Sequence, residues 1–398
     1  MTKEFKPKDI PIAHICIDEK FIDCAIHIFE SINGIKNTFY CYTTQPLHFI
    51  KNKKEVKTYN DKKKLIEQIN TCNYTIIFLH GRILPYPLLY RIKEQSTLVW
   101  LSWGFDLYNN NQIKLLNDRL ININLYKPIT RSTLLKPKML LRFAIEIARK
   151  IKNEKLIYAK KFYKRVDYIS TVLPEEYEFI KEKCEKFSIK NFEFKYLIEE
   201  DIPKDIQNHN KEIKNILIGN SGSESNNHLD ILYALHTIDT SKRKIIIPIN
   251  YAGKMSYVKE IKKTAHQLGI NNITYLERFI PYEEYARLLN SCSIAIFGHI
   301  RQQALGNIYM LLQRGVKIFL YRDSFVYKSL KKVGYKIYSI EDMTGQSLNE
   351  PLSMQDCQNN LNLYRKFANF PSYLQNLSKE IHDIVCAKSN HISSSKCR

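Results

Sequence analysis

The stretch KNILIGNSGSESNNHLDILYAL, residues 214–235, decides the fold of this chain. Its first five residues form a short apolar run with the length and composition of a buried strand. A loop of small polar residues follows, and from His228 to Leu235 the apolar residues recur at helical spacing. Strand, polar loop and helix in this order are the repeating unit of a parallel sheet covered by helices, so the stretch predicts an α/β fold.

The same order recurs on both sides of this stretch. Downstream we expect strands over 244–249, 274–276, 293–297 and 316–320, and helices over 255–268, 282–291 and 306–314. Upstream we expect strands over 10–17, 38–43, 74–79 and 97–103, and helices over 20–32, 62–70 and 87–94. Two such series predict two Rossmann-like domains, each with a parallel sheet covered on both faces.

The polar segment 199–214 is the best candidate for a linker between the two domains. We expect an N-terminal domain over 1–204, a second domain over 205–350, and C-terminal helices with a tail over 351–398, one helix crossing back to the first domain. Open parallel sheets bind ligands beyond the carboxyl ends of their strands. Two facing domains of this kind therefore predict a central cleft lined by the loops that follow strands.

The charge is strongly positive, because 61 Lys and Arg stand against 40 Asp and Glu, a net +21. Much of it falls in 127–165, where basic residues alternate with apolar ones. A basic amphipathic helix there predicts contact with an anionic membrane surface; nucleic acid or a simple solvated face are the alternatives. No long apolar run and no signal-peptide pattern is found, so we expect a cytosolic, membrane-associated protein.

The loop after the 214–218 strand is a candidate phosphate cradle. Glycine lets the backbone approach a ligand closely, and a helix N-terminus favours anions. The alternative is a polar turn with an ordinary helix cap. The expected donor-binding residues of this loop are Gly219, Asn220, Ser221, Gly222, Ser223, Asn226 and His228.

A second loop follows the 293–297 strand. Its arginine can neutralise a diphosphate, while its amides can hydrogen-bond sugar hydroxyls; an ordinary surface loop is the alternative. The expected donor-binding residues here are Arg301, Gln302, Gln303, Gly306 and Asn307. Phe279 and Tyr282, after the third strand, could stack on a base, or belong to the core.

In the first half, two strand ends carry polar side chains. Asp106 and His80 are candidates for the general base that takes a hydroxyl proton, with a helix cap and a structural histidine as the alternatives. Arg301 would act as the catalytic cation. No Asp-x-Asp triad and no Cys/His pattern with zinc spacing occurs, so we expect no metal site and no cofactor.

Three segments together resemble a known family. WLSWGFDLY (100–108), ILIGNSGSESNNH (216–228) and RQQALGN (301–307) are similar to segments of the TDP-N-acetylfucosamine:lipid II N-acetylfucosaminyltransferase family. The resemblance implies a GT-B glycosyltransferase fold, a nucleotide-diphosphate sugar donor held by the second domain, and a polyprenyl-diphosphate-linked acceptor at the first. The acceptor-binding residues expected on this basis are Arg82, Trp103, Gly104 and Tyr108.

We therefore expect a hexosyltransferase that moves a 4-amino or 4-acetamido deoxy sugar from a dTDP-sugar to a lipid-linked saccharide. Its place would be the cytoplasmic face of the inner membrane, in surface polysaccharide synthesis like that of enterobacterial common antigen, without nucleic acid. The alternatives are a non-enzymatic nucleotide-sugar or lipid-binding protein and a basic nucleic-acid-binding protein.

Overall fold

The computed structural model describes residues 9–108, 118–134, 155–197, 202 and 215–395. The chain divides into two compact units. Unit 1 comprises Met1–Asn122, Arg149–Glu200 and Ala368–Arg398, and unit 2 comprises Ile123–Ala148 and Asp201–Phe367. Each unit has its own parallel sheet, which confirms the expected α/β class with two Rossmann-like domains.

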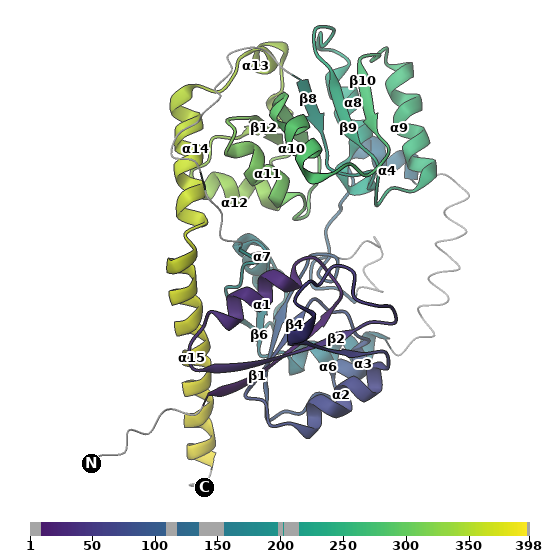
Figure 1. Ribbon diagram of the computed structural model, residues 1–398. Helices are drawn as coiled ribbons and strands as arrows, with labels where there is room; N and C mark the ends of the chain where they lie inside the picture. The colour runs from purple at the N-terminus through teal and green to yellow at the C-terminus, as the bar shows by residue number, and fades with distance from the viewer. Residues whose placement is uncertain (1–8, 109–117, 135–154, 198–201, 203–214, 396–398) are drawn as a thin grey trace. The chain divides into compact units, whose positions relative to one another are not determined.

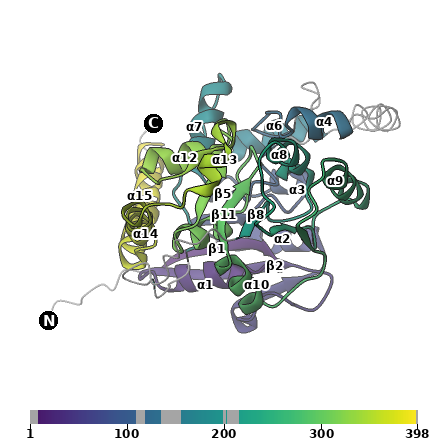
Figure 2. The ribbon, with the colours of Figure 1, turned by 90° about the horizontal axis from the view of Figure 1, so that it is seen from above.

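Unit 1 contains a parallel sheet of seven strands in the order β3-β2-β1-β4-β5-β6-β7. Figures 1 and 2 show β1 and β2 running side by side in purple. The strands are β1 (Ile10–Ile17), β2 (Ile35–Tyr42), β3 (Val56–Tyr59), β4 (Ile76–His80), β5 (Thr97–Leu101), β6 (Tyr168–Ser170) and β7 (Lys190–Asn191). The helices are α1 (Ile22–Glu30), α2 (Lys62–Thr71), α3 (Tyr86–Leu89), α6 (Lys155–Arg165), α7 (Pro174–Lys183) and α15 (Phe370–Ser395), with a 3₁₀ turn at Lys53–Glu55.

The C-terminal helix α15 returns to unit 1, as expected from the sequence. The Tyr373 hydroxyl on this helix donates to Lys195 O at 2.8 Å, and Lys195 N donates back to the same hydroxyl at 2.9 Å. Phe370 stacks on His27 of α1 at a centroid distance of 5.4 Å. These contacts fix the start of α15 on the first unit.

Unit 2 contains a six-stranded parallel sheet in the order β10-β9-β8-β11-β12-β13. The strands are β8 (Asn215–Ile218), β9 (Ile245–Pro248), β10 (Ile273–Leu276), β11 (Cys292–Phe297), β12 (Lys317–Leu320) and β13 (Tyr338–Ser339). The helices are α4 (Pro128–Leu134), α8 (His228–Leu235), α9 (Met255–Gln267), α10 (Tyr282–Asn290), α11 (Leu305–Leu312), α12 (Phe325–Val333), α13 (Gly345–Asn349) and α14 (Met354–Phe367), with 3₁₀ turns at Glu224–Asn226 and Ile340–Asp342.

One face of the unit 2 sheet packs on α8 and α9. Alternate strand residues such as Ile216, Ile218 and Ile247 join Leu232 of α8 and Ile261 of α9 in a single buried cluster. Side chains of a strand alternate between faces, and Leu217 and Ile246, which alternate with these residues, are also buried, so both faces of these strands are apolar and buried. This arrangement positions the strand ends rigidly and leaves the loops beyond them as the place for polar function.

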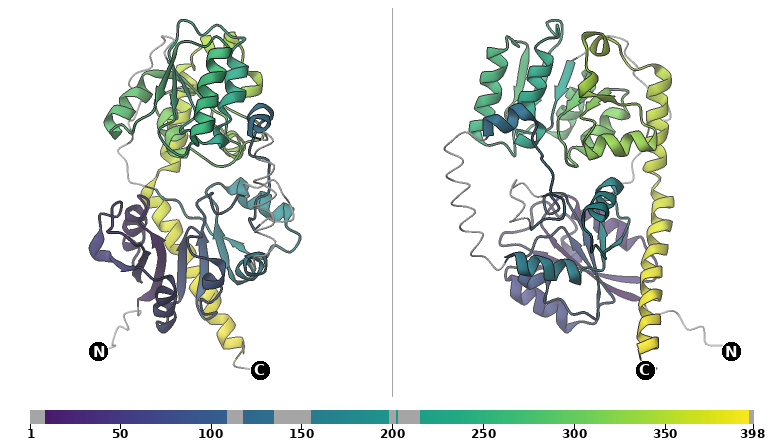
Figure 3. Two further views of the ribbon diagram at one scale, coloured as in Figure 1. Left: turned by 90° about the vertical axis from the view of Figure 1, so that its right-hand side faces the viewer. Right: turned by 180° about the vertical axis from the view of Figure 1, so that it is seen from behind.

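The helix α4 comes from the first half of the sequence but lies in unit 2, against α8 (Figure 3). The Asp230 carboxylate of α8 accepts hydrogen bonds from Ile129 N and Thr130 N, both at 2.9 Å. A carboxylate on the first N–H groups of a helix is a favourable cap, here supplied by another helix. The linear division expected at 204/205 did not include this exchange.

The structure describes only the two ends of the basic run 127–165. Its beginning is α4 in unit 2, its end is α6 in unit 1, and 135–154 lies outside the described residues. Two of its cations are already bound within the protein. Lys127 lies 3.0 Å from the Asp323 carboxylate, and the buried Arg165 lies 3.1 Å from that of Asp167. Desolvating a cation is costly unless it is paired, so these two are not available to a membrane.

Most expected elements are present with small shifts in their ends, and α8 has the expected bounds. The helix expected over 87–94 shrinks to the short α3. The short strands β6, β7 and β13 and the helix α12 were not expected. Apart from Ile202, the proposed linker 199–214 lies outside the described residues.

Candidate active site

The order of the unit 2 sheet reverses between β8 and β11, and the loops that follow these strands meet. A Cβ placed on Gly298, directly after β11, would lie 2.3 Å from the Asn226 carbonyl oxygen. Only glycine, which has no Cβ, allows the two loops to approach so closely at this position. The phosphate-cradle loop and the arginine loop expected from the sequence are therefore brought together at the edge where parallel sheets bind ligands.

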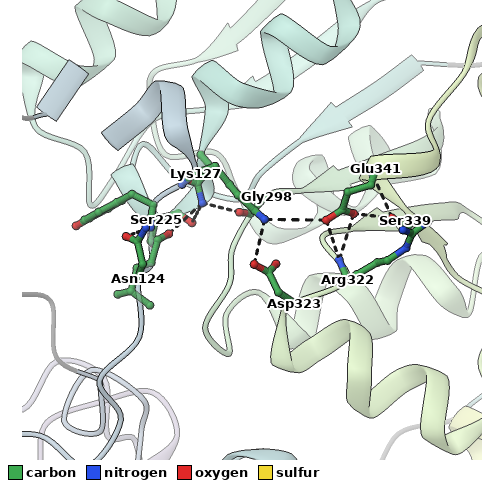
Figure 4. A network of polar contacts seen from close by, with 11 residues as sticks. Asn124, Lys127, Ser225, Gly298, Arg322, Asp323, Ser339 and Glu341 are labelled. Atoms are coloured by element: carbon green, nitrogen blue, oxygen red, sulfur yellow. Dashed lines mark hydrogen bonds and ion pairs between the residues drawn. The ribbon is translucent and has the colours of Figure 1, made fainter. Parts of the chain in front are cut away.

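Asn227 joins these loops to the segment that enters unit 2 before α4. It has left-handed backbone angles, φ 50°, at the N-cap of α8. Its side-chain amide donates to Gly298 O at 2.7 Å and to Leu125 O at 3.1 Å, and its Oδ1 accepts from Lys127 N at 2.8 Å. One buried side chain thus holds three segments, and Figure 4 shows Lys127 and Gly298 in the surrounding polar network.

Gln303 links the two loops a second time. Its Oε1 accepts from the Ser225 hydroxyl and its Nε2 donates to Asn220 Oδ1, both at 2.8 Å. The Asn220 amide donates in turn to the Tyr251 hydroxyl after β9 at 2.9 Å. Gln303 was expected on a sugar hydroxyl, but here its amide is used between loops, which makes it a positioning residue.

Some backbone N–H groups of the first loop form hydrogen bonds within the protein, and others do not. Gly219 N donates to Ile296 O at 2.9 Å and Gly222 N donates to Tyr251 O at 3.0 Å. The N–H groups of Asn220 and Ser221 have no hydrogen-bond partner within the described part of the chain. Backbone N–H groups of a loop between a strand and a helix can donate to a phosphate, so those of Asn220 and Ser221 are available to a ligand, whereas those of Gly219 and Gly222 are already hydrogen-bonded.

The ring of His228 lies beneath this loop. It is fully buried, and a Cβ on Gly219, whose φ is +67°, would lie 2.9 Å from His228 Nε2. Neither ring nitrogen, nor Asn226 Oδ1, has a hydrogen-bond partner among the described residues. Burial lowers the pKa of His228 to about 3, so the ring is neutral near pH 7 and supports the loop without adding positive charge.

The remaining expected donor residues are less closely tied together. The Ser223 and Ser225 hydroxyls lie 3.0 Å apart, and Ser221 is buried with Oγ accepting from the Asn226 amide at 3.2 Å. Asn307 donates to the Tyr285 hydroxyl at 2.9 Å. In the second loop Arg301 and Gln302 are half-exposed, and Gly306, at the start of α11, is exposed. After β10, Phe279 is 88% exposed, and the side chain of Tyr282 lies outside the described residues.

In unit 1, Asp106 is fully buried and its carboxylate is surrounded by donors. Its Oδ2 accepts from Arg82 N at 2.7 Å and Trp100 Nε1 at 2.8 Å, and its Oδ1 accepts from Trp103 N at 2.9 Å. Burial raises the pKa of Asp106, while these bonds oppose the rise. Solvent does not reach the carboxylate, so the geometry favours the structural alternative over a general base.

His80 belongs to a chain of buried hydrogen bonds whose direction can be worked out. Asn37 Nδ2 donates to Phe29 O at 3.1 Å, so its Oδ1 is the acceptor for His14 Nε2 at 3.1 Å. Burial lowers the pKa of His14 to about 3, so this ring is neutral and its Nδ1 is an acceptor. The donor to it, at 3.1 Å, is therefore His80 Nε2.

The chain continues to the indole of Trp103. Burial lowers the pKa of His80 well below its usual value, so its Nδ1 is an acceptor, and the Tyr196 hydroxyl donates to it at 2.9 Å. That hydroxyl accepts from Trp103 Nε1 at 2.7 Å. Both nitrogens of His80 are occupied and its ring is fully buried, which again favours the structural alternative.

This chain of hydrogen bonds ends at Trp103, which belongs to a cluster of partly exposed aromatic rings. The Trp103 ring lies 6.5 Å from that of Phe21 and 6.3 Å from that of Phe105, which are 41% and 48% exposed. Aromatic rings with one exposed face offer a hydrophobic surface to a ligand. Trp103 is therefore well placed for the acceptor-binding role expected from the sequence, and Phe21, Phe105 and Tyr196 are neighbours that sequence reasoning missed.

The other expected acceptor residues differ from Trp103. Tyr108 is 2% exposed and its hydroxyl donates to the Glu176 carboxylate, so it offers no surface to a ligand. Gly104 is a buried turn residue with φ +83°. The Arg82 guanidinium is half-exposed and lies 4.4 Å from the Tyr86 ring centroid.

Among the described residues there is neither a metal-binding cluster nor a helix that could span a membrane. No three or more His, Cys, Asp or Glu side chains there are grouped to hold a metal ion. No described helix has the length and hydropathy needed to span a membrane.

Two parallel-sheet units, with polar loops beyond the carboxyl ends of the strands, define the GT-B class of glycosyltransferase folds. Known structures agree. The chain is similar to the N-terminal domain of trehalose-6-phosphate phosphatase from Candida albicans, with TM-score 0.62 and 9% identity over 98% of this chain and 99% of that one. In sequence, residues 157–380 match the family described as 4-alpha-L-fucosyltransferase, glycosyl transferase group 56. This is more than half of the chain, and the chain belongs to that family.

Two further structures share the fold. The lipopolysaccharide outer core galactosyltransferase WaaB, in its apo form, aligns with TM-score 0.58 and 10% identity over 95% of this chain and 100% of that one. A glycosyltransferase from Rickettsia africae aligns with TM-score 0.56 and 11% identity over 94% and 99%. The expectations of a GT-B fold and of a fucosyltransferase-type glycosyltransferase are thus confirmed.

Proposed function

We propose that unit 2 holds the diphosphate of a nucleotide-sugar donor between the loops that follow β8 and β11. The observation that carries this proposal is a pair of N–H groups in the loop between β8 and α8, those of Asn220 and Ser221, which have no partner among the described residues. Arg301, in the second of the two joined loops, supplies the positive charge. Together these groups match the donors and the charge that a diphosphate needs.

The donor in this proposal is a dTDP-linked 4-amino or 4-acetamido deoxyhexose. The family description supports a 6-deoxy sugar, since fucose is one, and the three sequence segments that resemble N-acetylfucosaminyltransferases support the amino substituent. The acceptor is a hydroxyl of a polyprenyl-diphosphate-linked saccharide. The exposed rings of Phe21, Trp103 and Phe105 are suited to stacking on its sugar.

The chemistry requires stabilisation of the leaving group. The acceptor oxygen forms a bond to the anomeric carbon, and the bond from that carbon to the diphosphate breaks, leaving its electron pair on the phosphate oxygen. The proton of the acceptor hydroxyl passes to an oxygen of the departing diphosphate. Arg301 and the Asn220 and Ser221 N–H groups stabilise this charge. Asp106 and His80 act as positioning residues in this scheme, because both are buried and fully hydrogen-bonded.

The donor site is tested by thermal unfolding of the full chain with dTDP, UDP, GDP or CMP. A ligand that binds only the folded state raises the melting temperature, so we expect dTDP to give the largest shift. Incubation with a dTDP-deoxyhexose and a polyprenyl-diphosphate saccharide should then yield an extended lipid. No shift with any nucleotide would overturn the donor site, and a shift without transfer would favour a non-enzymatic binding protein.

We also propose that α6 carries the contact with an anionic membrane. Ile157 is 61% exposed on this helix, and Lys160, Lys161 and Lys164 are exposed beside it. An exposed apolar side chain with basic neighbours suits an anionic lipid surface. Sedimentation with phosphatidylglycerol vesicles should decrease severalfold for Ile157→Asp and stay unchanged for Met255→Asp, an exposed apolar residue of unit 2. Equal sedimentation of both variants would contradict the assignment.

A further inference from the structure

The segment 125–127 is held at the point where the two donor loops meet. Asn227 binds both sides of Tyr126: its amide donates to Leu125 O at 3.1 Å, and its Oδ1 accepts from Lys127 N at 2.8 Å. The same amide donates to Gly298 O at 2.7 Å. Tyr126 is therefore fixed at its backbone to the start of α8 and to the start of the arginine loop.

A second set of contacts keeps this segment in place. Tyr126 N donates to Asn124 Oδ1 at 3.2 Å. The Lys127 ammonium lies 3.0 Å from Asp323 Oδ2, after β12, and 4.2 Å from the Tyr321 ring centroid, as part of the network in Figure 4. The segment is thus anchored to loops that follow three strands of the unit 2 sheet, although Lys127 precedes Asn227 by 100 residues.

The side chain of Tyr126 is half-buried. Within the described part of the chain no group forms a hydrogen bond with its hydroxyl. Burial raises the pKa of this phenol, with the Glu224 charge acting in the same direction and the Arg301 charge opposing it. The hydroxyl therefore keeps its proton near pH 7, and both charged side chains are near enough to act on it. A neutral phenol in this place is a hydrogen-bond donor without a protein acceptor.

We propose that Tyr126 is a further donor-binding residue, whose hydroxyl donates a hydrogen bond to the diphosphate of the nucleotide-sugar beside Arg301. The inference rests on the proposed function of the unit 2 loops and adds a residue from the first half of the chain. A phenol and a guanidinium together give a diphosphate one neutral and one charged donor. Tyr126 thereby extends the binding groups beyond the two loops found from the sequence.

The test is isothermal titration of the full-length protein with dTDP and with UDP. The variant Tyr126→Phe removes only the hydroxyl, and Tyr233→Phe is the matched control, since Tyr233 lies on α8 in the same unit and is 42% exposed. Arg301→Ala is the reference for loss of the site. A hydrogen bond to a charged group corresponds to about a tenfold change in affinity or more, so we expect Tyr126→Phe to weaken binding of the preferred nucleotide about tenfold.

The outcomes separate this inference from the proposed function. Weaker binding by Tyr126→Phe, with Tyr233→Phe unchanged and all melting temperatures without nucleotide within a degree or so, supports the inference. Normal binding by Tyr126→Phe together with loss of binding by Arg301→Ala overturns the role of Tyr126 and leaves the donor site standing. Normal binding by both variants overturns the donor site and the inference with it.

Discussion

The carboxyl edges of the two sheets differ in how their polar groups are used. In unit 1 Asp106 accepts three hydrogen bonds, and His80 takes part in a chain of hydrogen bonds from Asn37 to Trp103. In unit 2 the loops are also tightly joined, but the N–H groups of Asn220 and Ser221 have no partner within the described residues.

This difference separates positioning from binding. Backbone N–H groups that are not used within the protein can donate to a bound phosphate, whereas hydrogen-bonded groups such as the Asp106 carboxylate hold the scaffold in place. In our proposal unit 2 therefore supplies the polar contacts to the donor, and unit 1 supplies the aromatic rings of Phe21, Trp103 and Phe105.

The largest effect is expected in unit 2, from Arg301→Ala. Loss of a cation that stabilises the leaving diphosphate should reduce turnover about 100-fold to 1,000-fold. The melting temperature should stay close to that of the unmodified protein, because Arg301 is half-exposed. Steady-state transfer kinetics measure the first effect and thermal unfolding the second. Arg91→Ala, exposed in unit 1, is the control, and turnover above a tenth of normal for Arg301→Ala would argue against its role.

The next largest effect is expected in unit 1, from Asp106→Asn. The Asn side chain has one acceptor oxygen in place of the two of Asp, so one or two of the three buried donors lose their acceptor. This loss should lower the free energy of unfolding by about 2–3 kcal/mol. Urea denaturation measures the loss, with the exposed Asp383→Asn of α15 as control. Affinity for dTDP should be unchanged. Full stability with abolished turnover would instead restore Asp106 as the general base.

A smaller effect is expected from Tyr196→Phe. This change removes both the donor to His80 Nδ1 and the acceptor for Trp103 Nε1, and should cost about 1–2 kcal/mol of unfolding free energy. Because the Trp103 ring loses its anchor, the KM for the acceptor should rise while the nucleotide affinity stays constant. Tyr168→Phe, a half-buried tyrosine of β6, is the control. An unchanged KM for the acceptor would show that the hydrogen bond from Trp103 to Tyr196 does not position the Trp103 ring.

The smallest effect concerns pH and the buried His228. Its pKa is about 3 in the folded protein against 6.5 for an ordinary histidine, so the unfolded chain binds the extra proton between these values. The stability it contributes is complete above pH 6.5 and is lost as the pH falls toward 3, by about 1.4 kcal/mol per pH unit.

Urea denaturation between pH 6.5 and 5 measures this slope. His228→Gln should reduce the slope by that amount, while the exposed His266→Gln of α9 should leave it unchanged. His14 and His299, whose pKa values burial also lowers to about 3, account for part of the remaining slope. Identical slopes for both variants would mean that the His228 ring is not buried in solution.

Much of the fold follows from local pattern. The helix α8 begins and ends where the apolar spacing predicts, because one stretch of sequence contains its strand, its loop and its buried face. The exchange of 123–134 into unit 2 could not be predicted, since its hydrogen bonds join residues about 100 positions apart. The ion pair of Lys127 with Asp323 could not be predicted for the same reason, because the spacing of charges along the sequence does not show which carboxylate lies beside a lysine.

In the candidate site, too, local features could be predicted from the sequence and long-range contacts could not. The two loops of unit 2 were found from their composition, as a run of small polar residues has few other uses after a buried strand. The junction at Asn227 was missed, although Asn is the residue other than Gly that best tolerates the left-handed angles it adopts. The chain of hydrogen bonds through His14 and His80 joins five separate segments of sequence, and Tyr196 lies 116 residues from His80.

The placement of α4 in unit 2 has a consequence for how the protein is synthesised. Ile129 and Thr130 leave the ribosome about 100 residues before Asp230, the carboxylate that caps their helix. At about 5–20 residues per second, this delay is about 5–20 s. Unit 1 in turn is incomplete until α15 has been made. Unit 1 therefore cannot finish folding until unit 2 has been translated, so a chaperone that shields the nascent chain should raise the yield of this enzyme.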